Sequence, residues 1–134
     1  DAAGLRKPGR LAARAAAAAD INNDGAVDVY VNQIDGPPVI LSNTSSRGAW
    51  LIVDLEGTES NRSAIGARVR VTAGKLTQWR TVQSGGSYIS QSDPRPHFGL
   101  GPAPEIDEIE VLWPSGKRTL MTSVTPNKVL KIRE

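Results

Sequence analysis

The sequence predicts an all-β protein, and two observations carry that prediction. Of the 134 residues, 13 are Gly and 9 are Pro, so many short elements joined by tight turns are favoured over a few long helices. From Trp50 onward, apolar and polar side chains alternate in segments bounded by Gly, Pro, Asn or Asp, which is the pattern of half-buried strands. The length suits one domain with an appendage, and we divide the chain into a region 1–46 and a larger region 47–134.

The smaller region contains an alanine run, an acidic loop and one strand. Because Ala is the best helix former, the run Ala15–Ala19 by itself is compatible with a helix or a strand. After the acidic loop, Val27, Val29 and Val31 alternate with polar or half-polar residues, and this alternation predicts a strand. A Pro-rich turn at 36–38 ends it.

The larger region contains six candidate strands. In one of them, Ala67 and Val69 are expected to point inward while Arg68 and Arg70 face water. The sequence Trp-Pro-Ser-Gly at 113–116 has Pro and Gly where a type I turn prefers them, which predicts a hairpin. Strands this short and numerous suggest a β-sandwich or a small barrel. The candidates are Trp50–Leu55, Ala67–Thr72, Leu76–Gln83, Ile106–Trp113, Arg118–Met121 and Lys128–Ile132.

Composition excludes several classes of function. The chain has no Cys and a single His, His97, which excludes disulfide frameworks, thiolate metal sites and thiol nucleophiles and leaves little scope for a His-based triad. Apolar and charged fractions of 39% and 22% are typical of a soluble globular chain. The longest weakly apolar stretch, 11–19, is interrupted by Arg14 and is far shorter than the ~20 residues of a membrane-spanning helix.

The charge distribution predicts no nucleic-acid partner. Sixteen Lys and Arg residues stand against fourteen Asp and Glu residues, a net charge of +2 with both signs spread along the chain. The densest basic stretch lacks the clustered cations and interleaved aromatic residues that nucleic-acid binding uses, so we interpret it as a solvated strand face. It consists of Arg62, Arg68, Arg70, Lys75 and Arg80.

The acidic loop 20–28 has the pattern of a calcium loop. Oxygen-bearing side chains stand at its positions 1, 3, 5 and 9, Gly25 at position 6 permits a sharp turn, and the carbonyl at position 7 adds a ligand. Calcium prefers six to eight oxygen ligands, whereas zinc prefers nitrogen or sulfur. A polar turn that binds nothing is the alternative, but three acids within nine residues favour a metal. The expected ligands are Asp20, Asn22, Asp24, the carbonyl of Ala26, and Asp28.

The loop resembles a propeller repeat more than an EF-hand. Position 12 is Val31 instead of the EF-hand Glu, and a strand follows in place of a helix. The segment 16–32 resembles one FG-GAP/VCBS-type repeat, the calcium-loop unit of integrin-like β-propellers. The resemblance implies that the alanine run is a strand, that the region is a propeller-type half-blade, and that the five loop residues bind calcium. One repeat cannot bury its own face, so another segment or a partner is expected to complete the sheet.

Three blocks of the larger region resemble parts of the ASPIC/UnbV family, and they occur in the same order as in that family. They are residues 57–71 with Asn61-Arg62, residues 84–101 with His97-Phe98, and residues 109–116 with Trp113-Pro114. This family follows FG-GAP/VCBS repeats in exported proteins. The resemblance implies a β-sandwich module, a location outside the cytoplasm, and a chain that is the last piece of a larger protein or a reduced relative.

These features together predict a non-catalytic, calcium-stabilised binding or assembly module that is periplasmic, cell-surface or secreted. Its expected partner is a protein or a parent propeller, or else a glycan, for which Trp50, Trp79 and Trp113 are candidates if they are not packing residues. The alternatives are a structural subunit of a larger membrane-associated or surface complex and, with less support, a hydrolase-type enzyme built on His97. The residues expected to bind the partner are Asn61, Arg62, Arg68 and Tyr88.

Overall fold

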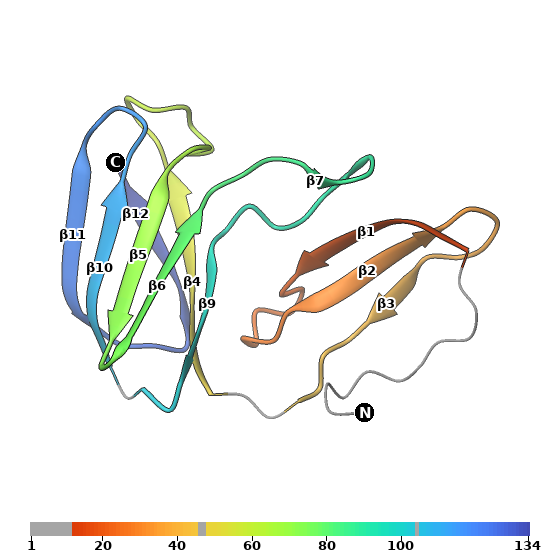
Figure 1. Cartoon of the computed structure of the whole chain (residues 1–134), viewed down its shortest axis with the longest axis horizontal. Coiled ribbons are helices and arrows are strands. Elements are labelled where there is room, and N and C mark those ends of the chain that lie inside the picture. Colours follow the sequence, from red (N-terminus) through yellow and green to blue (C-terminus); the bar gives the residue numbers. More distant parts are fainter. Residues whose placement is uncertain (1–11, 46–47, 104) are drawn as a thin grey trace. The chain divides into compact units, whose positions relative to one another are not determined.

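The computed structural model describes residues 12–45, 48–103 and 105–134. Within these residues the chain forms twelve strands and no helix, which confirms the all-β prediction (Figure 1). The sheets have three, four, three and two strands, and none closes into a barrel. The predicted boundary between residues 46 and 47 lies outside the described residues.

Contacts divide the chain into two compact units, each with a discontinuous sequence. The first unit combines Asp1–Arg47 with Ser84–Pro94, and the second combines Gly48–Gln83 with Arg95–Glu134. Residues 84–94 therefore leave the second unit and return to it after packing in the first. Alternation of side chains did not predict this excursion, because it reports faces of strands and not their neighbours.

The first unit is an antiparallel sheet in the order β1-β2-β3, formed by β1 (Ala13–Ala19), β2 (Asp28–Gln33) and β3 (Val39–Leu41). The alanine run is a strand, as the family resemblance implied. Ala16 pairs with Val31 and Ala18 with Val29, so pairing with a β-branched strand overrides the helix propensity of Ala.

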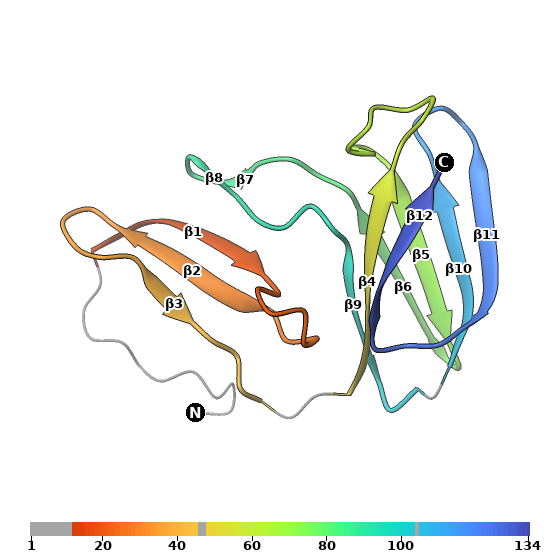
Figure 2. The same cartoon turned by 180° about the vertical axis from the view of Figure 1, so that it is seen from behind.

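A short hairpin covers the free edge of β1 within the first unit (Figure 2). It consists of β7 (Gly86–Ser87) and β8 (Ser90–Gln91), and Gly85 and Gly86, where the hairpin begins, both have positive φ. The Ser90 hydroxyl donates to the carbonyl of Ala16 at 3.0 Å, and the amide of Ala18 donates to Ser92 Oγ at 3.1 Å. The amide of Asp93 donates to the carbonyl of Ala18 at 2.9 Å, so this edge of β1 is satisfied locally.

The second unit has two sheets, in the orders β11-β10-β5-β6 and β12-β4-β9. All its strand pairs are antiparallel except β12 with β4, which is parallel. The strands are β4 (Ala49–Glu56), β5 (Arg68–Ala73), β6 (Leu76–Thr81), β9 (His97–Gly101), β10 (Ile106–Leu112), β11 (Arg118–Val124) and β12 (Lys128–Arg133).

Both sheets of the second unit contribute to one hydrophobic core. Val69 and Ile109 come from the four-stranded sheet, Leu51 and Phe98 come from the three-stranded sheet, and all four are fully buried. Because no sheet of the described residues closes on itself, the small-barrel alternative does not apply to these strands. Between β10 and β11, the amide of Gly116 donates to the carbonyl of Trp113 at 2.9 Å, which confirms the predicted hairpin turn.

Candidate functional site

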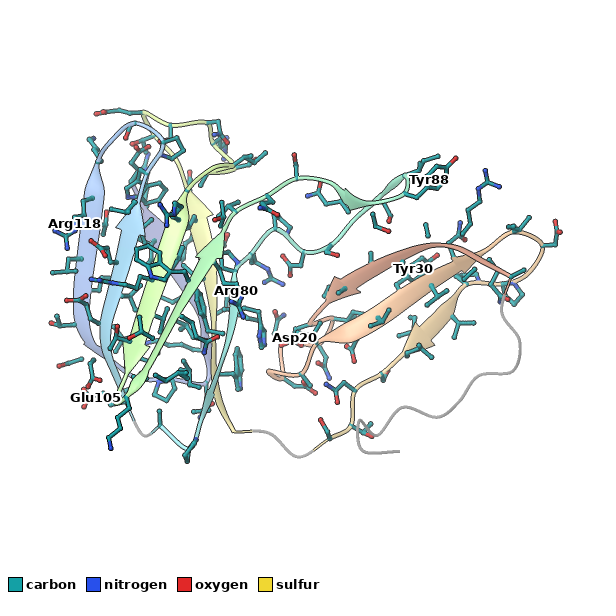
Figure 3. All side chains as sticks on the ribbon, viewed as in Figure 1. Asp20, Tyr30, Arg80, Tyr88, Glu105 and Arg118 are labelled. Atoms are coloured by element: carbon teal, nitrogen blue, oxygen red, sulfur yellow. The ribbon has the colours of Figure 1, made fainter. Side chains whose placement is uncertain are left out.

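The acidic loop connects β1 to β2, and its two end residues are buried. Asp20 directly follows β1, Asp28 opens β2, and their side chains are 4% and 7% exposed (Figure 3). Asn22 is exposed and Ala26 is buried. Burying a carboxylate is unfavourable unless hydrogen bonds or positive charge compensate it, so the partners of both groups decide what the loop can do.

The Asp20 carboxylate organises the first half of the loop. Its Oδ1 accepts the amide of Asp24 at 3.0 Å, and its Oδ2 accepts the amide of Gly25 at 2.7 Å. Gly25 has φ +90° and Asn23 has φ +54°, so the chain curls around Asp20 through two left-handed residues. The sharp turn predicted at Gly25 is therefore confirmed.

Asp28 ties the loop to the segment that follows β3. Its Oδ1 accepts the amide of Asn43 at 2.8 Å and its Oδ2 accepts the amide of Ile21 at 3.4 Å. The contact with Asn43 was invisible to sequence analysis, because hydrogen bonds over 15 residues leave no local pattern. Asp28 therefore has a structural role that does not require a metal.

Asp24 is bonded within the loop and has further interactions. Its Oδ1 accepts the amide of Ala26 at 2.9 Å, and its Oδ2 accepts Nδ2 of Asn22 at 2.8 Å. Two predicted ligands thus contact each other directly. Four of the five predicted side-chain or backbone ligands belong to one continuous hydrogen-bonded turn.

The donor set fits a hard cation in its chemistry. Each carboxylate oxygen that accepts one amide keeps a second lone pair, and the loop adds an amide oxygen and a carbonyl. Among the described residues, Asp20 and Asp28 have no ion pair with a basic side chain. In the part of the chain that the structure describes, no group of three or more His, Cys, Asp or Glu side chains is placed to hold a metal. The loop thus offers oxygen ligands of the right kind without their being gathered around one point.

In the second unit, Asn61 shapes its own loop. Its Nδ2 donates to the carbonyl of Ile65 at 2.8 Å, and its Oδ1 accepts the amide of Ile65 at 2.9 Å. These two hydrogen bonds close a turn that contains Ala64, which is fully buried and has φ +53°. Both ends of the Asn61 amide are therefore used inside the loop, while the neighbouring Arg62 is exposed.

A carboxylate that sequence analysis missed holds the same loop from the other side. Glu134 Oε2 accepts the amides of Thr58, Glu59 and Ser60 at 2.8, 2.9 and 2.7 Å, and its Oε1 accepts the hydroxyls of Ser60 and Ser115. Desolvation raises the pKa of Glu134, but these hydrogen bonds outweigh it and lower the pKa from 4.5 to about 2. The partners are far apart in sequence, so no motif signalled them.

The outer face of the four-stranded sheet carries a line of alternating charges. Arg70 of β5 contacts Glu108 of β10 at 2.6 Å and Glu110 of β10 at 2.8 Å, and Glu110 also pairs with Arg118 of β11. Arg70 and the two acids face away from the core, as predicted. Yet the Glu110 side chain is only 7% exposed, because two guanidinium groups cover it.

The remaining predicted partner-binding residues lie on separate elements. Arg68 is exposed on β5, and its guanidinium carbon lies 4.9 Å from the ring centroid of Trp79. Tyr88 belongs to the first unit, where its hydroxyl accepts a hydrogen bond from Arg14 at 3.3 Å. The structure therefore does not gather Asn61, Arg68 and Tyr88 on one element or in one unit.

Trp113, His97 and two serines are the side chains on which the sugar-platform and hydrolase alternatives depend. Trp113 is buried with its Nε1 donating to Thr119 at 2.9 Å, so the three Trp residues do not form one exposed platform. The ring of His97 stacks on Trp50 with a centroid distance of 6.4 Å. Ser90 and Ser92, two hydroxyl groups close to His97 in the sequence, hydrogen-bond to the backbone of β1.

A search of the described residues finds no helix long and apolar enough to cross a membrane.

Comparison with known proteins identifies relatives of the chain. Cartilage acidic protein 1 of Mus musculus is 31% identical over 120 residues, which cover 84% of this chain and 18% of the mouse protein. The Homo sapiens protein of the same name gives the same identity and coverage. The Xenopus tropicalis protein is 30% identical over 106 residues, which cover 75% of this chain and 16% of that protein.

The chain thus spans less than a fifth of the length of these relatives. The family described as ASPIC and UnbV matches residues 57–134, more than half of the sequence and the larger part of the second unit. The chain belongs to the ASPIC and UnbV family.

Proposed function

We propose that the chain is a non-catalytic, calcium-stabilised module that docks a protein partner outside the cytoplasm. The observation that supports the metal site is the burial of Asp20 and Asp28 in one oxygen-rich loop, where neither carboxylate forms an ion pair with a basic side chain of the described residues. Calcium would supply the missing positive charge there. Asp20, Asn22, Asp24, the Ala26 carbonyl and Asp28 would hold it.

The docking part is supported by how little the first unit buries. Among its described residues, only Ala26 and Val31 are buried hydrophobic residues. A three-stranded sheet needs a buried hydrophobic face to be stable by itself, and this one buries few apolar side chains, so further apolar contacts are expected to complete it. Its exposed large hydrophobic residues are Ile21, Val27, Tyr30, Ile34, Ile40, Tyr88 and Ile89.

The proposal includes the type of fold of each unit. We take the first unit as an FG-GAP/VCBS-type half-blade and the second as a β-sandwich, with the division near residues 46 and 47. A parent propeller is then the natural partner of the first unit, because a half-blade has an unpaired face. The limited coverage of the relatives, whose remaining length has no counterpart here, agrees with this interpretation.

A location outside the cytoplasm is proposed from the family and from the name of the relatives, which places those proteins in cartilage. The proposed role needs no catalytic group. A structural subunit of a larger surface complex is the second candidate, favoured by the same exposed apolar residues. It differs in predicting one permanent partner, so purification from the native source would yield a complex of fixed size.

The experiment that tests the calcium role uses an optical property of the chain. Both tyrosines, Tyr30 and Tyr88, lie in the first unit, and all three tryptophans lie in the second. Tyrosine fluorescence excited at short wavelength and amide exchange in residues 20–28 therefore report on the first unit. A free calcium concentration of about 100 times the dissociation constant of the site stabilises the folded unit by about 2.7 kcal/mol.

We expect calcium to protect the amides of residues 20–28 relative to EDTA, and to raise the unfolding temperature of the first unit. Asp24→Asn, which keeps one acceptor oxygen but removes a charge, should abolish the calcium effect. Asp54→Asn, on β4 of the second unit, is the matched control and should retain it. Identical behaviour of the wild type in calcium and in EDTA would refute the metal site.

A further inference from the structure

The hairpin formed by β5 and β6 carries charge of one sign only. Residues 67–83 contain four basic residues and no Asp or Glu. Arg70 is neutralised by two acids of β10. Among the ion pairs of the described residues, none involves Arg68, Lys75 or Arg80, so three positive charges surround β6 without a carboxylate partner.

The strand β6 is an edge of the four-stranded sheet. It is the last strand in the order β11-β10-β5-β6, and five of its six residues are exposed. It contains no Pro and its pairing with β5 is regular over all six residues, so nothing in the strand itself blocks a further strand. An edge of this kind presents unpaired N–H and C=O groups.

Side chains close the core side of β6 without adding a strand. Gln78 Nε2 donates to the carbonyl of Gly99 on β9 at 2.6 Å, and the Arg80 guanidinium carbon lies 5.8 Å from the centroid of the buried Phe98 ring. Figure 3 labels Arg80 on this strand. The core is therefore sealed here. On β6 itself, Arg80 Nη1 donates to the carbonyl of Trp79 at 3.0 Å, and an added strand would displace this bond between two exposed residues.

The outer side of β6 holds a preorganised cation beside an exposed aromatic ring. Trp79 is 40% exposed, and the guanidinium carbons of Arg68 and Arg70 lie 4.9 and 5.5 Å from its centroid. Stacking on the ring limits the rotamers of Arg68 and leaves its N–H groups able to bind a carboxylate. Arg70 already has its acids, so Arg68 is the group that lacks an anion.

Building on the docking role proposed above, we propose that β6 binds an extended acidic segment of a partner protein by strand addition. Backbone hydrogen bonds to β6 would supply affinity, and a Glu or Asp on the outer face of the added strand would pair with Arg68 beside Trp79. The added strand would lie about 4.8 Å from β6 and about twice that from β5, a gap that a Glu side chain and the Arg68 side chain stacked on Trp79 span together. A second copy of this chain fits poorly, because pairing β6 with β6 would bring like charges together.

The test is a titration of the ¹⁵N-labelled full chain with defined peptides, followed by amide shifts. The probe is a blocked seven-residue peptide that alternates Thr and Glu. Two comparison peptides have Lys in place of each Glu, or the Glu sequence with alternate backbone N-methylation, which prevents strand pairing. A sulfated disaccharide provides the same negative charge without a peptide backbone.

We expect saturable shifts of the amides at 76–81 with the Glu peptide, and none with the Lys or the N-methylated peptide. Arg68→Gln should weaken binding by about tenfold, the worth of one charge-assisted hydrogen bond. Arg133→Gln on β12 removes the same charge from the other sheet and should change affinity by less than about twofold. Both variants are at exposed positions, so the fold is retained.

Several results would overturn the proposal. No saturable shift at 76–81, equal binding of the Lys peptide, or full binding by Arg68→Gln would each do so. Equal binding of the N-methylated peptide or the sulfated disaccharide would show a simple anion site in place of strand addition. The titration is run in calcium and in EDTA: loss of the calcium effect on residues 20–28 would refute the metal site alone, whereas absent peptide binding would refute the β6 surface alone.

Discussion

Glu110 is the most informative residue to change in the second unit, because it is a buried carboxylate on a face that is otherwise exposed. Its side chain is 7% exposed and contacts Arg70 at 2.8 Å as well as Arg118. Within the described residues, the buried Arg70 Nε has no hydrogen-bond partner. Among the described residues, Glu108 and Glu110 are the carboxylates that compensate the charge of Arg70, whose guanidinium carbon also lies 5.5 Å from the centroid of the Trp79 ring. The proposed change is Glu110→Gln, which keeps the size of the side chain and removes its charge.

The expected loss follows from the two contacts. The contact with Arg70 is an ion pair in which the Glu110 side chain is only 7% exposed, and a charged contact of this kind contributes about 1.5–3 kcal/mol. The contact with Arg118, whose side chain is 58% exposed, contributes about 0–1 kcal/mol. Together, Glu110→Gln should lower the free energy of unfolding of the second unit by about 2–4 kcal/mol. Glu110→Gln leaves Arg70 paired with Glu108 only, and the loss is large because the carboxylate that is removed is nearly buried between two guanidinium groups.

The assay is urea unfolding followed by tryptophan fluorescence, since all three tryptophans are in the second unit. With a slope of about 2 kcal/mol per molar urea, the midpoint should fall by about 1–2 M. Glu108→Gln is the control, because Glu108 is 33% exposed and its loss leaves Arg70 paired with Glu110. We expect the control to cost at most about 1 kcal/mol. Equal midpoints for the two variants would show that the burial of Glu110 adds nothing to its contacts.

Three further predictions concern other contacts. The lowered pKa of Glu134 means that its carboxylate stabilises the folded state above about pH 4.5 and that this contribution is lost as the pH falls towards about 2. The difference in urea midpoint between wild type and Glu134→Gln should therefore shrink between these two pH values. A difference that stays constant over this pH range would contradict the prediction. Asp28→Ala removes the acceptor of the Asn43 amide and should lower the free energy of unfolding of the first unit by about 1–3 kcal/mol even in EDTA. Asp28→Asn keeps an acceptor oxygen and should lower it by less. Equal rates of amide exchange at Asn43 in the two variants would count against this. Phe98→Ala should lower the free energy of unfolding of the second unit by about 3–5 kcal/mol, with Leu120→Ala, at an exposed position of β11, within about 0.5 kcal/mol; similar urea midpoints for the two would contradict the assigned core.

Local pattern was sufficient for much of the second unit. Alternation along β5 and β10 predicted which side chains face the core, because a strand segregates its neighbours to opposite faces whatever it pairs with. The turn at Gly116 was predicted for a similar reason: Pro and Gly restrict the backbone by their own covalent structure. The family blocks predicted membership in ASPIC and UnbV, which the comparison confirmed.

The alanine run shows where local pattern stops. Ala15–Ala19 has no side chain large enough to specify a face, so helix propensity and strand pairing compete. Pairing with Val29 and Val31 decides the outcome, and that partner lies beyond the acidic loop. The excursion of residues 84–94 to β1 is of the same kind, because its hydrogen bonds join residues 74 positions apart.

The acidic loop is divided between the two sources of information. The sequence by itself determined the oxygen-rich ligand types and the turn at Gly25, since both are properties of nine consecutive residues. Only the tertiary structure decided that Asp20 and Asp28 are buried and that Asp28 accepts the Asn43 amide. The same is true of a different loop, in the second unit, where Glu134 accepts the amides of Thr58 and Ser60. Burial and the charge that surrounds a carboxylate depend on segments brought together by folding, and a linear pattern carries no record of that proximity.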